Sequence, residues 1–193
     1  MTDFPLRPEN RRQWLLGSAS ATLGGTWVHG AAQAQSTPPA LPATGTSAAI
    51  PLVLPRTEFV YEAIAELSPS MALGHGPLGE RRMVPITGGT FEGPGIRGKV
   101  LAGGADRQLL RKDGVRLLDA LYEMQTDDGD IITVHNKVMT RTDAEGKPYR
   151  FSHINLTAPE GKYGWLNQFV YVGTLHSLQP ARMAVAIRVY KLV

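Results

Sequence analysis

The sequence predicts an all-β fold of short antiparallel strands, either a sandwich or a barrel. Apolar and polar residues alternate with a period of two in several runs, most cleanly at residues 59–66 and 184–193, as expected for strands with one buried face. The runs are separated by glycine, proline, aspartate and asparagine, as in all-β domains. Asp113-Gly114 and Asp128-Gly129 each lead into an apolar segment, which favours hairpins.

Six segments have a strand-like pattern, and a seventh is ambiguous. The six are residues 59–66, 82–92, 131–135, 149–154, 166–172 and 184–193. In the seventh, residues 115–125, leucines and a methionine are spaced as in an amphipathic helix, but the segment runs into the Asp128-Gly129 turn just before Ile131. An Asp-Gly pair between two apolar runs favours paired strands, so we predict a strand here too.

The amino terminus is predicted to be an export signal. The pair Arg11-Arg12 precedes a Gly/Ala-rich apolar stretch over residues 15–28, and Ala32-Gln33-Ala34 places small residues around a cleavage point. The segment resembles a twin-arginine signal but departs from the usual pattern at Asn10, Trp14 and Leu16. A basic tail or a signal anchor is the alternative. We expect residues 1–34 to be removed and the protein to be periplasmic or secreted.

Composition narrows the classes of partner. Residues 35–54 are rich in proline, serine and threonine and are predicted to be a flexible linker before one β domain at residues 55–193. The net charge is only +3 over 193 residues, and no Lys/Arg run after the signal suggests a nucleic-acid partner. The chain has no cysteine, which excludes disulfides and thiol nucleophiles. No later stretch is apolar enough for a membrane anchor after processing.

Two motifs suggest ligands, but their context favours turns. Residues 93–98 read Gly-Pro-Gly-Ile-Arg-Gly, the spacing of a dinucleotide-binding loop. That loop requires a helix after it, whereas here another short strand-like segment follows, so we predict loop glycines and no cofactor. His135 and His153 are weak metal candidates, without metal-ligand spacing in sequence. Asp127, Asp128 and Asp130 lack the order of a calcium-binding loop, and we expect no metal.

Six residues are candidates for a ligand site. Asp106 follows two glycines, where backbone approaches a ligand closely, and a carboxyl group beside an apolar cavity is suited to general acid or base chemistry. Asp128 is first a turn residue and is expected to assist. If residues 163–167 form a strand, Tyr163, Trp165 and Asn167 share one face and suit an aromatic ligand. An aromatic plug, with the Asn167 amide bonded to backbone, is the alternative.

The chain resembles the domain-of-unknown-function family 3237. The resemblance rests on the order and spacing of four elements over residues 59–193: Gly103-Gly104-Ala105-Asp106, Asp113-Gly114, Thr126-Asp127-Asp128-Gly129 and Tyr163-Gly164-Trp165-Leu166-Asn167. It implies an antiparallel β-barrel of the small-ligand-binding type with an interior cavity. It also implies cofactor-free chemistry on aromatic molecules, as in some fungal relatives. Arg107 stands where members often have tryptophan, and is therefore a candidate ligand contact. Ala120-Leu121-Tyr122 stands where they often have an arginine.

Together these observations predict an exported β-barrel that binds an apolar or aromatic small molecule. The barrel is expected to catalyse a cofactor-independent lyase, hydratase or isomerase step, with Asp106 as proton donor or acceptor. A non-catalytic binding or structural barrel, with aspartates that only make turns, is the alternative, and both remain open from sequence. Apolar strand faces left over on a barrel also suit a homo-oligomer.

Overall fold

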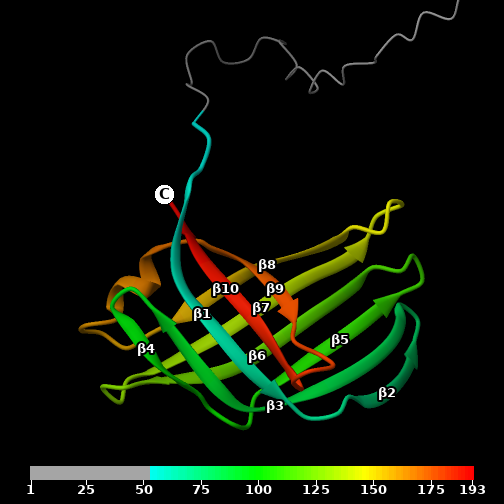
Figure 1. Ribbon diagram of the computed structural model, residues 1–193, viewed down its shortest axis with the longest axis horizontal. Helices are drawn as coiled ribbons and strands as arrows, with labels where there is room; N and C mark the ends of the chain where they lie inside the picture. The colour runs from blue at the N-terminus through cyan, green and yellow to red at the C-terminus, as the bar shows by residue number, and fades with distance from the viewer. Residues whose placement is uncertain (1–52) are drawn as a thin grey trace, which may run out of the picture. The chain divides into compact units, whose positions relative to one another are not determined.

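The computed structural model describes residues 53–193, so the predicted signal peptide and nearly all of the predicted linker lie outside the described residues. The described part holds ten strands and one short 3-10 helix, η1 (Figure 1). Their bounds are β1 Thr57–Leu67, β2 Met71–Gly76, β3 Gly79–Gly93, β4 Ile96–Val100, β5 Ala105–Arg111, β6 Arg116–Thr126, β7 Ile131–Thr142, β8 Pro148–Thr157, η1 Gly164–Gln168, β9 Tyr171–Ser177 and β10 Ala184–Leu192. None of its helices is long and apolar enough to cross a membrane.

The strands form a closed antiparallel barrel of eight positions, as the sequence predicted. The order around the barrel is β1, β10, β9, β8, β7, β6, then β4 and β5 in one shared position, then β3, which pairs with β1 and closes the ring. β2 pairs only with β3 and extends beyond the ring. In Figure 1, β1 and β10 cross the view over β6 and β7.

The long strand β3 serves two sets of neighbours. Its first half pairs with β2 and β5, and its second half pairs with β1 and β4. Gly89 lies where β3 meets β1, with φ +138°, and a Cβ there would stand 1.9 Å from the Ile64 carbonyl oxygen. Only glycine permits so close a backbone approach.

The predicted hairpins are confirmed. Gly114 and Gly129 both have positive φ, at +84° and +96°, which glycine adopts without strain. The Asp128-Gly129 turn joins β6 to β7, and residues 115–125 fall almost wholly within strand β6. Their helix-like spacing arises because Leu117 and Leu121 lie on the outer face of the barrel, where alternation predicts polar residues. Residues 93–98 span the hairpin between β3 and β4, in which Pro94-Gly95 is the turn and Gly93 pairs with Ile96.

One predicted strand is wrong. Residues 166–172 do not form a single strand, because η1 ends at Gln168 and β9 begins at Tyr171. The helical turn is closed by the Leu166 amide, which donates to the Tyr163 carbonyl oxygen at 3.0 Å. The Tyr171 hydroxyl also donates to the Leu166 carbonyl oxygen at 3.0 Å. Aromatic and apolar residues in this stretch imitate a strand, but they anchor a turn to the core.

Side chains alternate between the interior and the outer surface along the barrel wall. On β5 to β8 the even-numbered residues point inward, including Asp106, Tyr122, Asn136 and Ser152. The interior is packed mainly with aliphatic and tyrosine side chains, among them Tyr61, Met124, Ile132, Val134 and Val189. The strand register therefore decides which polar residues meet inside.

Candidate functional site

The barrel interior holds a small apolar chamber that opens into a wider vestibule. The chamber has a volume of about 70 Å³, and the vestibule has a volume of about 490 Å³. Both are lined by five of the same side chains, Leu67, Gln108, Leu118, Leu175 and Val185. The chamber is completed by Ala65, Ile86, Asp106, Ala120, Tyr122, Asn136, Val138 and Ile187. The vestibule lies within the usual size range of small-molecule pockets, about 300–1,000 Å³.

Asp106 supplies the carboxyl group of the chamber wall. It lies on β5 and is only 8% exposed. One oxygen, Oδ1, accepts the Asp119 backbone N–H at 3.0 Å, and Oδ2 accepts the Gln108 side-chain N–H at 2.7 Å. Burial raises the pKa of Asp106 above its ordinary value, although these two hydrogen bonds oppose the rise. A buried carboxyl group with a raised pKa is suited to general acid or base chemistry.

Two further chamber residues carry polar atoms without a partner. The Tyr122 hydroxyl and Asn136 Oδ1 are buried and form no hydrogen bond within residues 53–193. Both side chains are only 1% exposed. Leaving a buried polar group unpaired costs about 1–3 kcal/mol, so both atoms are free to pair with a polar group that enters the chamber. Burial raises the pKa of Tyr122, which keeps its hydroxyl protonated and able to donate.

The strand register brings these groups together. Asp106 is the partner of Ala120 on β6, and Ala120 is the partner of Asn136 on β7. The small Ala120 side chain leaves space between the carboxyl and the amide. Tyr122 lies two residues along β6 on the same inner face. Alternation along β5 was enough to place Gln108 on the same face as Asp106, but no sequence prediction used it. Tyr122 and Asn136 follow only from the pairing of β6 with β5 and β7.

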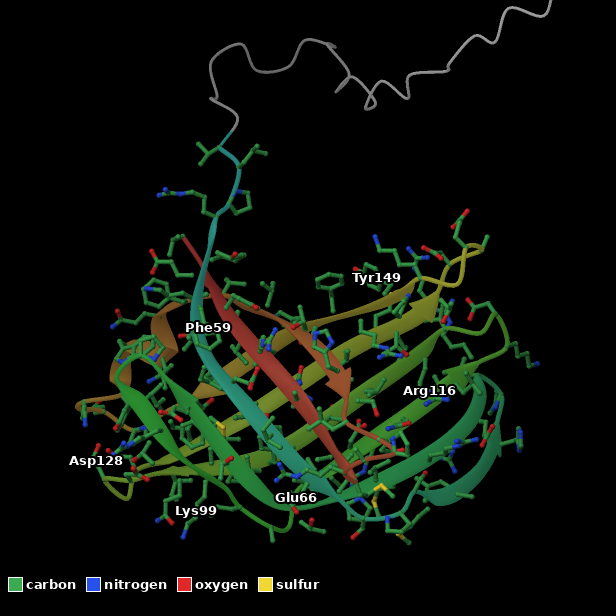
Figure 2. The ribbon with its side chains drawn as sticks, viewed as in Figure 1. Phe59, Glu66, Lys99, Arg116, Asp128 and Tyr149 are labelled. Atoms are coloured by element: carbon green, nitrogen blue, oxygen red, sulfur yellow. The ribbon has the colours of Figure 1, made fainter. Side chains whose placement is uncertain are left out.

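Asp128 lies in the turn that follows β6, whereas Asp106 pairs with Ala120 in the middle of β6. Its Oδ2 accepts hydrogen bonds from Lys162 Nζ, at 2.6 Å, and from the Tyr163 hydroxyl. These two bonds lower the pKa of Asp128. Thr126, the last residue of β6, is six residues beyond Ala120, the partner of Asp106. At 3.3 Å per residue, this is about 20 Å along the strand. Figure 2 labels Asp128, which lies just beyond Thr126. The structure therefore does not bring the two aspartates together.

Tyr163, Trp165 and Asn167 do not share a strand face, because they lie at and within η1. Asn167 Oδ1 accepts the Ala158 N–H at 2.9 Å, and its Nδ2 donates to the carbonyl oxygens of Ala158 and Gly164. Trp165 packs edge-on against Phe169, with ring centroids 6.5 Å apart. None of the three lines the chamber or the vestibule.

Arg107 lies on the outer face of β5, next to the inward-facing Asp106, and lines an outer groove with Arg81 and Leu73. Neither the chamber nor the vestibule includes it. Of the six candidates from sequence, Asp106 is therefore the one that the structure places in the chamber wall.

The two histidine candidates lie outside the barrel cavity. His135 Nε2 is 2.6 Å from Asp119 Oδ1, and His153 is exposed on the outer face of β8. Among residues 53–193, no three side chains of metal-ligating type converge.

The comparison with known families agrees with the barrel. A family model described as "Protein of unknown function (DUF3237)" matches residues 55–192. The chain belongs to the DUF3237 family. A relative named UPF0311 protein, from Rhodopseudomonas palustris, is 31% identical over 131 residues, which cover 61% of this chain and 86% of the relative.

Solved structures of similar proteins share the DUF3237 barrel. A β-barrel-like protein from Acinetobacter baumannii AYE is 31% identical with a TM-score of 0.69, covering 74% of this chain and 99% of that one. A relative named hydroalkoxylation enzyme, from Penicillium herquei, is 29% identical over 120 residues, which cover 62% of this chain and 74% of the relative. A solved structure of an enzyme from the same fungus has a TM-score of 0.60 at 24% identity, covering 75% of this chain and 98% of that one, and shows the common fold.

Proposed function

We propose that this protein binds an apolar or aromatic small molecule in the barrel interior and transfers a proton to or from it through Asp106. The reaction class is a cofactor-independent lyase, hydratase or isomerase step. The observation that carries the proposal is the environment of Asp106. A carboxyl group that is 8% exposed lines an otherwise apolar chamber, beside two buried polar atoms without partners.

Asp106 alone can both give and take back the proton in such a step. The neutral carboxyl gives its proton to a carbon or oxygen of the ligand. The carboxylate left behind is held by the Asp119 N–H and the Gln108 side-chain N–H. It regains a proton from the hydroxyl or C–H group of the ligand that loses one, so the carboxyl group ends the cycle as it began. A proton transfer of this kind requires no redox cofactor.

The other chamber groups are assigned to orientation. We assign Tyr122 to donate a hydrogen bond to a ligand oxygen, and Asn136 Oδ1 to accept one from a ligand hydroxyl. The apolar wall keeps water away, which strengthens each of these interactions. We assign structural roles to Asp128, Tyr163 and Asn167, because their polar atoms are already bonded at η1 and its flanking turns.

The fungal relative supports this reaction class. Its name, hydroalkoxylation enzyme, describes the addition of an alcohol across a double bond, which forms a C–O bond and moves a proton to carbon without net oxidation or reduction. A barrel with the same fold is thus compatible with acid–base chemistry.

Native mass spectrometry of protein from its own host tests binding first, since a co-purifying molecule appears as added mass. Ala120→Phe is expected to fill the chamber beside Asp106 and abolish this added mass. Leu121→Phe, at the next residue but on the outer face, is the matched control and is expected to keep it. Retention of the molecule by Ala120→Phe would place binding outside the chamber.

Asp106→Asn tests the acid–base step with the molecule so identified. The variant is expected to bind the molecule and to lose its conversion. If it keeps full turnover, the protein binds without using Asp106, and the non-catalytic barrel becomes the better description.

We also propose that the protein acts after export, because Arg11-Arg12 and the apolar stretch after it suit a cleaved signal. Amino-terminal sequencing of the periplasmic protein is expected to begin at Gln35. Finding the intact terminus in the cytoplasm would overturn this.

A further inference from the structure

We propose that the bound molecule is an organic anion, with an apolar body and one terminal carboxylate or similar oxyanion that Arg116 and Arg150 hold in the vestibule. The inference rests on the proposed function, because it assigns the ligand class of the same cavity.

The two arginines face the same space. Arg116 on β6 is the register partner of Thr140 on β7, and Thr140 is the partner of Arg150 on β8. All three are even-numbered and lie on the inner face, and all three line the vestibule. Two strand spacings separate the arginine backbones by about 10 Å, a span that two arginine side chains can close. A carboxylate above the Thr140 hydroxyl can therefore meet both guanidinium groups. Figure 2 labels Arg116.

The vestibule carries an unbalanced positive charge. Its lining includes Arg82, Arg116 and Arg150 and no carboxylate. Arg82 is neutralised by Glu80, with Nε 2.6 Å from Oε1. Neither Arg116 nor Arg150 has an ion-pair partner within residues 53–193, whereas Arg188 on the outer wall lies 2.6 Å from Glu62. Two unpaired guanidinium groups at the entrance of an apolar cavity favour an anionic ligand over a neutral one.

The depth of the cavity defines where the anion lies on the ligand. Arg116 is four residues from Ala120, the partner of Asp106, which is about 13 Å along the strand. The chamber without the vestibule has a volume of about 70 Å³, which is smaller than a cavity of roughly 150 Å³ that holds benzene. Only the reacting end of a ligand fits beside Asp106. The remainder must extend past Leu118 and Leu175 into the vestibule, with the anion at the far end.

Anion binding is also coupled to the proton on Asp106. The charge of Arg116 is one of the influences that lower the pKa of Asp106, against the larger effect of burial. An anion paired with Arg116 offsets that charge and leaves Asp106 more readily protonated. Binding of the ligand thus prepares the acid that the proposed reaction uses.

Two fluorescent probes that differ by one sulfonate test the assignment. They are 1-anilinonaphthalene-8-sulfonate and its uncharged parent, N-phenyl-1-naphthylamine. We expect the natural sequence to bind the sulfonate at least about tenfold more tightly, because charge-assisted hydrogen bonds add more than neutral ones. The double variant R116Q/R150Q is expected to remove this preference and to keep its affinity for the neutral probe within about twofold.

Matched variants separate charge from folding. R116K/R150K keeps the charge and is expected to retain most of the preference. R141Q, next to Thr140 but on the outer face of β7, is expected to change neither affinity. Circular dichroism and the unfolding midpoint verify that each variant folds. An unchanged sulfonate affinity in R116Q/R150Q would overturn the assignment.

The outcomes also separate this inference from the proposed function. If Ala120→Phe abolishes binding of both probes while R116Q/R150Q changes neither, the chamber is a binding site and the anion assignment is wrong. If the natural sequence binds neither probe, both proposals fail together.

Discussion

Replacing Asp106 by asparagine should change the stability of the barrel in a pH-dependent way. The free energy of unfolding of the variant minus that of the natural sequence should be larger at neutral pH than at acidic pH. The variant keeps the shape of the side chain. Its Oδ1 can still accept the Asp119 N–H, and the Gln108 amide can rotate to accept from the new Nδ2, where it now donates to Oδ2. The change therefore removes a titrating group while leaving its two hydrogen bonds nearly intact.

The sign follows from the direction of the pKa shift. Burial raises the pKa of Asp106 in the folded protein, while the unfolded chain titrates near the ordinary value of about 3.9. Between the two pKa values the folded state holds the proton more tightly, so stability falls as the pH rises. The penalty is absent below the unfolded pKa and complete above the folded one. Each tenfold difference in proton affinity is worth about 1.4 kcal/mol.

Urea unfolding, followed by circular dichroism from about pH 4 to about pH 8, measures this difference. The free energy of unfolding of Asp106→Asn minus that of the natural sequence should rise with pH and then level off. Asp127→Asn is the control, since it makes the same substitution at a side chain that is 59% exposed and forms a surface ion pair with Arg97. If the difference in the free energy of unfolding between Asp106→Asn and the natural sequence does not change with pH, the Asp106 carboxyl group is well solvated. Burial would then give it no special suitability as an acid or base.

Three further predictions concern the chamber and its frame. Tyr122→Phe removes a buried hydroxyl without a partner. Urea unfolding should show a free energy of unfolding that is higher by about 1–3 kcal/mol. The same variant should bind more weakly any ligand that uses the hydroxyl. Asn167→Ala removes three hydrogen bonds to backbone and should cost about 1–3 kcal/mol without changing probe affinity. Gly89→Ala places a Cβ 1.9 Å from the Ile64 carbonyl oxygen and should prevent β1 from pairing with β3, seen as loss of the folded far-ultraviolet spectrum or of soluble protein.

Two of these have a matched control variant, and the Asn167 prediction has an outcome that would contradict it. Tyr149→Phe alters an exposed tyrosine, 38% accessible, and should be neutral; if it stabilises as much as Tyr122→Phe, burial is not the cause. Weakened probe binding in Asn167→Ala would mean that η1 shapes the cavity. Gly95→Ala is the control for Gly89→Ala, because Gly95 also has positive φ but has open space around its Cβ position. If Gly89→Ala folds normally and Gly95→Ala is more damaging, the contact with the Ile64 carbonyl oxygen is not what requires glycine at position 89.

The candidate site shows where local pattern was sufficient and where it was not. Two glycines before a carboxylate predict that Asp106 faces a ligand from a loop. The structure corrects the loop, because Asp106 lies within strand β5, on its inner face. The alternation of Tyr163, Trp165 and Asn167 predicts a strand. In the structure, Asn167 bonds the backbone of Ala158 and Gly164 instead, and no local pattern distinguishes these uses of an amide.

The sequence by itself determined the all-β class, the hairpin turns and the alternation that divides each strand between inner and outer faces, because turn chemistry and the two-residue period are local properties. The register of the consecutive hairpins, which sets Asp106 beside Ala120 and Asn136 and Arg116 across Thr140 from Arg150, follows from the turns that join the strands. Tertiary structure alone decided how the sheet closes, because β1 and β3 pair although no hairpin turn connects them. That closure brings Ala65, Leu175 and Val185 over the inner face of β5 to β7, so the enclosed chamber and its charged entrance are properties of the closed ring.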